Sequence, residues 1–445
     1  MVAAVALTRH MRILFLSHYF PPEVNAPANR THEHCREWVK AGHEVHVITC
    51  VPSHPRGVPF HGYRSRWYQR EQIDGITVHR MWTYLAANSG VLKRTINFLS
   101  FVPSAVARAL TLGSFDVIIG TSPQFFCAVA TWMAASLKRT PWVFELRDLW
   151  PESIEAVGAG RAYMPLGLLH RLEMRMYRGA RMVVSVSRSF MDNLESRGIN
   201  RAKMAFVPNG VDAEFWKAGS REAGRAALQA KPSDLIVSYI GTVGMAHDLG
   251  TVLDVAGRFK SEQLNVRFVI VGDGAELPML RQRATGAGLT NVVFSGLVPR
   301  ARIPDYLAAS EVSLVTLKRS DVFKTVLPSK MFESMAAGTP IVLAVEGEAK
   351  QILVQSGAGV AAMPGDAGSI ASELAILLQN AERRRAMGAA GALFVEQEFS
   401  RAAWARRYLT VLDQAVQGAM DASPPIHATF QPPSSAPSGR VTQPT

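Results

Sequence analysis

The chain has 445 residues, 48% of them hydrophobic and 19% charged, which is the composition of an ordinary globular protein of two or three domains. No apolar run reaches about 18 residues, so no spanning helix is predicted, and the apolar residues 1–7 lack the basic start of a signal peptide. The three cysteines have no CxxC spacing and are expected to be buried thiols in a reducing compartment. The net charge of +12 leaves nucleic acid, an anionic membrane and phosphorylated small molecules open as partners.

Strand and helix patterns alternate along the chain, which predicts an α/β fold with parallel sheets. In the first half, strands are expected at 12–18, 44–50, 76–82, 116–121, 141–146, 182–187 and 204–208. In the second half, they are expected near 235–240, 266–271, 291–295, 312–317, 341–345 and 359–363. Helical patterns lie between most of them, so each half is expected to form a doubly wound sheet, with a ligand site in the cleft between the two.

The division into domains follows from where the apolar runs stop. The first sheet domain is expected at 11–212 and the second at 233–395. Residues 213–232, where polar residues and Lys-Pro replace the apolar runs, are predicted to be a linker. An amphipathic pattern predicts a helix within 396–420, and the proline-rich and serine-rich residues 421–445 predict a disordered tail.

The most informative segment is a short helical pattern that begins after Pro328 and ends at Gly338. Ser329, Lys330 and Glu333 lie three or four positions apart and therefore share one face near its N-terminus. Unpaired N–H groups and the positive end of the helix dipole suit a phosphate there. A cation and a carboxylate beside them could hold a diphosphate and a ribose. The alternative is a solvated Lys330–Glu333 pair.

Glycine turns follow several other predicted strands, at 239–244, 266–274, 291–298 and 207–212, and the strand at 12–16 leads through a Pro-Pro loop into a helix. In this order, the segments resemble the retaining nucleotide-sugar glycosyltransferases of family 4, which have the two-domain GT-B fold. The resemblance covers residues 11–415. Within the family, the chain looks most like bacterial enzymes that assemble surface polysaccharides such as O-antigen, capsule or exopolysaccharide. The helix at 396–420 would then cross back to the first domain.

The resemblance implies a donor site in the second domain. Glu333 matches the second glutamate of the family's Glu-x7-Glu motif, which is associated with the nucleotide ribose, but the first glutamate is replaced by Thr325. Family members also place an arginine and a lysine after the strand that ends at Gly241, where this chain has Thr242 and His247. These departures leave the sugar contacts open. The predicted donor-binding residues are Gly241, Thr242, Gly244, His247, Gly272, Asp273, Gly274, Gly296, Leu297, Val298, Ser329, Lys330 and Glu333.

The chain contains no Asp-x-Asp and no cluster with metal-ligand spacing, so neither a metal nor a cofactor is expected. The diphosphate would then be stabilised by a cation and a helix N-terminus. Lys330 is the first choice because its place on the helix is fixed. Lys318, Arg319 and Lys324 are alternatives, although a solvated loop explains them equally well.

Charged residues crowd the end of the predicted strand at 141–146, an arrangement that is unfavourable unless they line a cleft. Glu152, there, and His18 and Asn25, in the first loop, are predicted to contact the acceptor or a phosphate. A structural ion pair is the alternative for the residues at 147–152. The predicted catalytic residues are Glu333, Lys330, Arg147 and Asp148.

Seven lysines and arginines interleave with aromatic residues in 56–94. This mixture suits a lipid headgroup layer, a solvated insertion or nucleic-acid bases, and no nucleic-acid-binding module accompanies it. A membrane surface is therefore favoured and nucleic acid is not. The combined prediction is a cytoplasmic enzyme, peripheral at the inner face of the membrane. It would move a sugar from a nucleotide sugar, UDP rather than GDP, to an undecaprenyl-diphosphate-linked or saccharide acceptor, with retention and without a metal. The alternative is a non-catalytic GT-B subunit that binds nucleotide or scaffolds a polysaccharide assembly complex.

Overall fold

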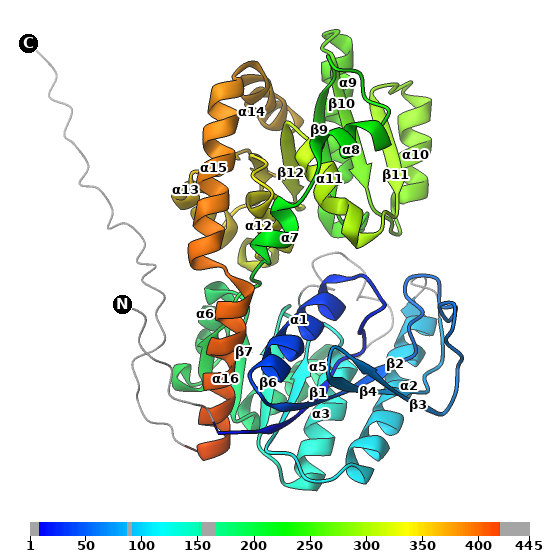
Figure 1. Cartoon of the computed structure of the whole chain (residues 1–445), viewed down its shortest axis with the longest axis vertical. Helices are drawn as coiled ribbons and strands as arrows, with labels where there is room; N and C mark the ends of the chain where they lie inside the picture. Colours follow the sequence, from blue (N-terminus) through cyan, green and yellow to red (C-terminus); the bar gives the residue numbers. More distant parts are fainter. Residues whose placement is uncertain (1–8, 87–90, 151, 153–165, 419–445) are drawn as a thin grey trace, which may run out of the picture.

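The computed structural model describes residues 9–86, 91–150, 152 and 166–418, so the predicted tail lies outside the described residues. Its first sheet has the strand order β3-β4-β2-β1-β5-β6-β7-β8, and all neighbours are parallel except β3 and β4 (Figure 1). The strands are β1 (Arg12–Leu16), β2 (Glu44–Cys50), β3 (Tyr68–Ile73), β4 (Ile76–Met81), β5 (Val117–Thr121), β6 (Trp142–Leu146), β7 (Met182–Ser185) and β8 (Met204–Phe206). The helices are α1 (Ala26–Lys40), α2 (Val91–Thr111), α3 (Phe125–Lys138), α5 (Leu166–Gly179), α6 (Arg188–Ser196) and the 3-10 turn η1 (Arg201–Lys203).

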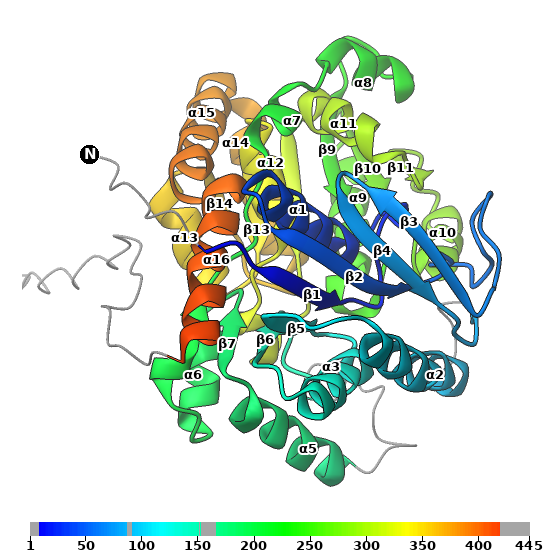
Figure 2. The same cartoon turned by 60° about the horizontal axis from the view of Figure 1, so that its bottom comes forward.

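Helices cover both faces of this sheet, which explains why its central strands read as continuous apolar runs. Alternate residues of β1 point to opposite faces. Leu14 and Leu16 belong to a core shared with α2, α3 and α5, whereas Ile13 and Phe15 belong to a core shared with α1 and the C-terminal helix α16 (Arg401–Gln417). Figure 2 shows α2, α3 and α5 together on one side of the sheet and α1 and α16 on the other.

The second sheet is entirely parallel, in the order β11-β10-β9-β12-β13-β14. The strands are β9 (Leu235–Ile240), β10 (Val266–Val271), β11 (Val292–Gly296), β12 (Val312–Thr316), β13 (Ile341–Ala344) and β14 (Gly359–Ala361). Its helices are α9 (Leu249–Ser261), α10 (Leu277–Gly286), α11 (Ile303–Ala309), α12 (Ser329–Ala336), α13 (Glu348–Ser356), α14 (Ala367–Gln379) and α15 (Ala381–Glu398), with 3-10 turns η2 (Met245–His247), η3 (Arg300–Arg302) and η4 (Val322–Thr325). The prediction of two parallel α/β sheets is confirmed.

Within the basic and aromatic segment 56–94, residues 68–81 form a β-hairpin instead of an irregular insertion. β3 pairs antiparallel with β4 through the turn Asp74-Gly75, both residues of which have positive φ. Arg80 on β4 is fully buried and forms an ion pair with Glu71 of β3. Arg80 therefore does not belong to any exposed basic surface. An Asp-Gly pair between two strands is a strong hairpin signal, because both residues tolerate the positive φ that a tight turn needs.

The stretch at 213–232 contains two short helices, α7 (Ala213–Lys217) and α8 (Arg221–Ala227). Asp212 and Ser220 cap them, each accepting a hydrogen bond from a backbone N–H of the first turn. At Gly224, α8 lies so close to α11 that a Cβ would overlap the carbonyl oxygen of Asp305. The residues expected as a plain linker thus pack against the second sheet domain.

The chain passes between the two halves twice, and the two crossings lie side by side. The N–H of Val211 donates to the carbonyl of Phe399 (2.8 Å), and the N–H of Arg401 donates to the carbonyl of Val211 (3.0 Å). Beyond this bridge α16 runs along α1, where the indole of Trp38 donates to the carbonyl of Ala405 (3.0 Å). Helix α16 therefore packs on the first domain, as Figure 1 shows.

Candidate active site

Helix α12 begins at Ser329, after Pro328 in extended conformation, and places Lys330 under the end of β9. The ammonium of Lys330 donates to the hydroxyl of Tyr239 (2.6 Å) and lies 4.0 Å from the centre of the same ring. That hydroxyl in turn donates to the carbonyl of Thr242 (2.7 Å). Burial lowers the pKa of Lys330 to about 7, and the charge of Glu333 opposes that shift. Lys330 is thus a preoriented cation held at a glycine turn.

The solvated Lys330–Glu333 pair offered as the alternative is not formed. Among the described residues, no ion pair within 4.0 Å joins the two side chains, and none donates a hydrogen bond to the Glu333 carboxylate. Burial raises the pKa of Glu333 above its ordinary value, and the charges of Arg300 and then Lys330 oppose this rise. A half-buried carboxylate with free acceptor positions is available to a ligand's hydroxyl groups.

Three strand ends are bonded directly to one another beside Lys330. The N–H of Gly241 donates to Val271, the N–H of Val243 to Asp273, and the N–H of Gly272 to Gly296. Gly241 has φ 147° and leaves so little room that a Cβ would lie 3.1 Å from the ammonium of Lys330. The predicted glycine residues of β9, β10 and β11 are thereby brought together. Leu297, just beyond them, is 60% exposed.

Gly272 is the tightest of these positions, because it combines φ 139° with a Cβ site that overlaps the carbonyl oxygen of Gly241. Gly272→Ala should therefore lower the free energy of unfolding by roughly 2–4 kcal/mol. Gly286→Ala is the matched control, since a Cβ there meets nothing within 4 Å and alanine favours a helix by about 0.5–1 kcal/mol. Urea unfolding of both variants measures the difference. Equal stability of the two variants would contradict the packing described for the turn.

His247 lies close to Lys330 but does not replace the missing basic pair. Burial and then the charge of Lys330 lower the pKa of His247 well below its ordinary value, so the ring is neutral. Its Nδ1 is buried without a hydrogen-bond partner in the described structure. Thr325 donates to the carbonyl of Val322 (2.6 Å), and Lys324 pairs with Asp321 (2.7 Å) at the surface. Lys330 is therefore the cation that contacts the glycine turn, and Lys324 is a solvated loop residue.

Charged side chains at the end of β6 enter the first domain instead of all facing outward. Glu145 is fully buried and pairs with the equally buried Arg30 of α1 (2.9 Å). Burial lowers the pKa of Arg147 to about 10, and its Nε and Nη1 atoms are buried without hydrogen-bond partners in the described structure. The backbone N–H groups of Arg147 and Asp148 donate to the hydroxyl of Ser122. One edge of the Arg147 guanidinium thus lacks a hydrogen-bond partner at this strand end.

The residues predicted to contact an acceptor or phosphate have structural partners. Asn25 caps α1 by accepting a hydrogen bond from the N–H of Ala28 (2.9 Å). Glu152 pairs with Arg197 (3.2 Å), which is the structural alternative raised for it. Contact of Asn25 or Glu152 with a ligand stays a prediction.

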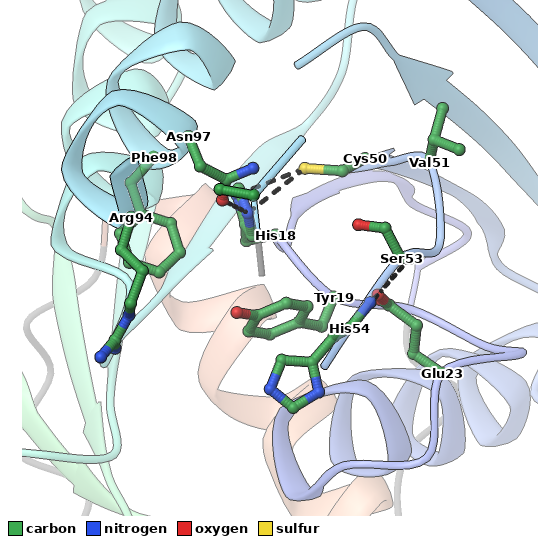
Figure 3. A pocket seen from close by; sticks show the side chains of 11 residues that line it. His18, Tyr19, Glu23, Cys50, Val51, Ser53, His54, Arg94, Asn97 and Phe98 are labelled. Carbon is green, nitrogen blue, oxygen red and sulfur yellow. Dashed lines mark hydrogen bonds between the residues drawn. The ribbon is translucent and has the colours of Figure 1, made fainter. Parts of the chain in front are cut away.

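His18 lines a small polar pocket in the first domain, formed by the ends of β1 and β2 and the start of α2 (Figure 3). Its Nε2 contacts the amide oxygen of Asn97 (3.0 Å), and its Nδ1 contacts the sulfur of Cys50 (3.3 Å). Burial lowers the pKa of His18 to about 4, so the ring is neutral and both nitrogens are engaged. On the opposite side of the pocket, Glu23 accepts hydrogen bonds from the N–H groups of Ser53 and His54 (both 2.9 Å).

Two contacts that the sequence did not predict join the domains. The guanidinium of Arg300, just after the β11 turn, pairs with Glu33 of α1 (2.5 Å). The carboxylate of Glu348, at the start of α13, accepts hydrogen bonds from the N–H groups of Arg188 and Ser189 (3.1 and 2.9 Å) at the start of α6. Partners this far apart in sequence give no pattern that could reveal them.

None of the described helices has the length and hydropathy needed to cross a membrane. Within the same residues, no group of three or more histidine, cysteine, aspartate or glutamate side chains is placed to hold a metal ion. Cys35, Cys50 and Cys127 are buried free thiols.

Two parallel α/β domains with glycine turns at their strand ends are the architecture of GT-B glycosyltransferases. Residues 25–210 match the glycosyl transferase 4-like domain family, and residues 220–394 match the glycosyl transferases group 1 family. The chain is 29% identical to WcaI of Escherichia coli K12, whose name assigns it to colanic acid biosynthesis, over 76% of this chain and 84% of WcaI. It is 25% identical to WbjE of Pseudomonas aeruginosa, named as a glycosyltransferase, over 56% of this chain and 63% of WbjE.

Solved structures agree on the fold. HepE of Anabaena, in complex with UDP and glucose, has a TM-score of 0.69 at 17% identity, covering 91% of this chain and 99% of HepE. WaaG, a glycosyltransferase of lipopolysaccharide biosynthesis, has a TM-score of 0.68 at 11% identity. The alignment covers 90% of this chain and 99% of WaaG. The chain belongs to the GT-B glycosyltransferases that join a glycosyl transferase 4-like domain to a glycosyl transferases group 1 domain.

Proposed function

We propose that this protein transfers a sugar from a UDP-sugar to a lipid-linked or saccharide acceptor in surface polysaccharide biosynthesis, with retention and without a metal. The observation that carries the proposal is Lys330, which is fixed by Tyr239 at the glycine turn that follows β9. HepE was solved with UDP and with UDP-glucose, which supports UDP over GDP. The names of WcaI and of TuaH of Bacillus subtilis, which refers to teichuronic acid biosynthesis, support a polysaccharide product.

In the proposed donor complex, α12 contacts both the diphosphate and the ribose. The N–H groups of its first turn and the ammonium of Lys330 would bind the diphosphate, and Glu333 would accept hydrogen bonds from the ribose hydroxyls. When the bond between the anomeric carbon and the diphosphate oxygen breaks, negative charge grows on that oxygen, where Lys330 stabilises it. The acceptor oxygen then bonds to the anomeric carbon, and its proton moves to the leaving diphosphate. Arg147 and Asp148 would position the sugar or acceptor hydroxyls.

The affinity for a UDP-sugar should fall as the pH rises above about 7. In the free protein, the pKa of Lys330 is lowered to about 7, and a bound diphosphate raises that pKa. Above pH 7, Lys330 must therefore take up a proton when the ligand binds. The dissociation constant should rise by up to about tenfold per pH unit above 7 and stay level below. Titration calorimetry between pH 6 and 9 measures this slope, and Lys330→Met should remove it. A slope that persists in the variant would assign the proton to another group.

We place the enzyme at the inner face of the cytoplasmic membrane through α2. Leu92, Ile96 and Leu99, spaced along one face of this helix, are 73%, 42% and 45% exposed. Lys93 and Arg94 beside them are exposed as well. Apolar side chains flanked by cations suit an anionic headgroup layer.

Vesicle sedimentation tests this placement. The protein should bind phosphatidylglycerol-containing vesicles more strongly than phosphatidylcholine vesicles, at about 1 kcal/mol per contacting cation. Leu92→Ser with Leu99→Ser should weaken binding, whereas Leu137→Ser on α3, which is 61% exposed, should not. Equal binding to both vesicle types would contradict the electrostatic part of the proposal.

Thermal-shift measurement with nucleoside diphosphates and nucleotide sugars, with and without EDTA, tests the donor site. A ligand at 100 times its dissociation constant stabilises by about 2.7 kcal/mol. UDP and a UDP-sugar should raise Tm in EDTA, and Glu333→Ala should reduce the shift. The absence of any shift would favour the second candidate in its scaffolding form, a non-catalytic GT-B subunit of a polysaccharide assembly complex, which the threonine in place of a glutamate at position 325 supports.

A further inference from the structure

A single carboxylate links the two domains next to the proposed donor site. Glu33 lies on α1 of the first domain and is 3% exposed. One of its oxygens pairs with Arg300, which follows the β11 turn in the second domain, at 2.5 Å. The other pairs with Arg401, at the start of the crossing helix α16. Glu33 thus joins three segments that are distant in sequence.

These contacts fix the guanidinium of Arg300. Besides Glu33, it lies over the ring of Phe215 on α7, 4.9 Å from the ring centre. Arg401 is anchored by its own backbone bond to Val211 and by its guanidinium, which donates to the carbonyl of Gly210. Because both cations on Glu33 are held in place, the orientation of Arg300 depends on the way the domains meet.

Arg300 also lies near α12, the helix that carries Glu333, because the Phe215 ring beneath its guanidinium packs against the core that contains Phe332 of α12. Its charge opposes the rise in the Glu333 pKa more strongly than that of Lys330 does. No ion pair within 4.0 Å joins Arg300 and Glu333 among the described side chains. The guanidinium therefore favours the ionised carboxylate without occupying its oxygens, which stay open to hydroxyl groups.

We propose that Glu33 of the first domain holds Arg300 as a positioning residue for Glu333, so that recognition of the nucleotide ribose depends on contact between the domains. Glu33 keeps Arg300 near Glu333 and also keeps it from pairing with that carboxylate. This inference rests on the proposed donor site. It adds that a residue of the first domain controls donor binding.

Calorimetric titration of UDP and of 2′,3′-dideoxy-UDP into the full chain tests the proposal. Glu33→Gln and Arg300→Gln should weaken UDP binding about tenfold, within the range of coupling between neighbouring groups. They should change dideoxy-UDP binding less than twofold, because that ligand lacks the hydroxyls that Glu333 would accept. Arg300→Lys keeps the charge and a single donor, so it should recover part of the loss. Lys217→Gln, which breaks the exposed pair of Lys217 with Glu396, is the control and should change neither affinity.

Variants that bind UDP within twofold of the wild type would overturn the inference. An equal loss of affinity for both nucleotides would also overturn it, because Glu33 would then stabilise the contact between the domains without acting on ribose recognition. If Glu33→Gln does not fold, the affinities of Arg300→Gln and Arg300→Lys for the two nucleotides provide the same test. A wild-type protein that binds no UDP, or that binds both nucleotides equally, would instead overturn the proposed donor site and the inference with it.

Discussion

Replacement of Lys330 by methionine should lower kcat/KM for the UDP-sugar by about 100–1000-fold, the range found when a group that stabilises transition-state charge is removed. Lys330 is oriented before any ligand arrives, by its bond to Tyr239 and by the close approach of Gly241. Thr242 and His247 stand where the resemblance to family 4 predicts a basic pair, and the His247 ring is neutral. No second cation contacts this turn among the described residues, so the loss should be large.

Lys324→Met is the matched control for this measurement. Lys324 lies just before α12, but its ammonium pairs with Asp321 at 2.7 Å and its side chain is 45% exposed. Its loss should change kcat/KM by less than about twofold, since an exposed pair contributes under about 1 kcal/mol. Steady-state kinetics measures kcat/KM for both variants. Similar losses in the two variants would show that the diphosphate is not held at Lys330.

Replacement of Arg30 by methionine should lower the free energy of unfolding by about 3–5 kcal/mol, because it leaves the charge of Glu145 buried without its partner. The pair is 2.9 Å long, and both side chains are almost completely buried. Arg30 also donates to the carbonyls of Val207 and Pro208 (2.9 and 2.8 Å), which lie just before the chain crosses to the second domain. Its loss removes support from β6 and from this crossing.

Arg283→Met provides the comparison for Arg30. Arg283 pairs with Asp254 at 2.5 Å, but the two side chains are 45% and 52% exposed. Breaking this pair should cost less than about 1 kcal/mol. Urea unfolding followed by circular dichroism measures both variants. If Arg30→Met lowered the free energy of unfolding as little as Arg283→Met, the buried Glu145 carboxylate would not need Arg30 as its partner.

The elements of the fold were largely predictable, because apolar runs and helical patterns are local. The helix after Pro328 and its end at Gly338 were predicted from capping chemistry and are confirmed by α12. The hairpin of β3 and β4 was not predicted because the polar and charged residues of β3 give no apolar strand pattern, although Asp74-Gly75 is a hairpin turn. The helices α7 and α8 were not predicted because they are only 5 and 7 residues long, too short for a helical apolar period to show in the sequence.

The candidate site was only partly predictable. The glycine turns, Lys330 and Glu333 could be named from residue type and spacing, and the structure brings them together. The partner of Lys330 could not be named, because Tyr239 lies 91 residues earlier, on strand β9. Glu33 and Arg300 are separated by 267 residues and meet only where the two domains touch. Such contacts depend on how the sheets are placed, and no local pattern encodes them.

Transfer of radiolabelled sugar from UDP-sugars to a lipid extract of the source membranes, in EDTA, tests the central claim most directly. The account predicts label in the lipid fraction with the wild-type protein and none above background with Glu333→Ala. Binding of UDP without transfer from any UDP-sugar would contradict it. That result would identify the chain as a nucleotide-binding subunit that does not catalyse transfer.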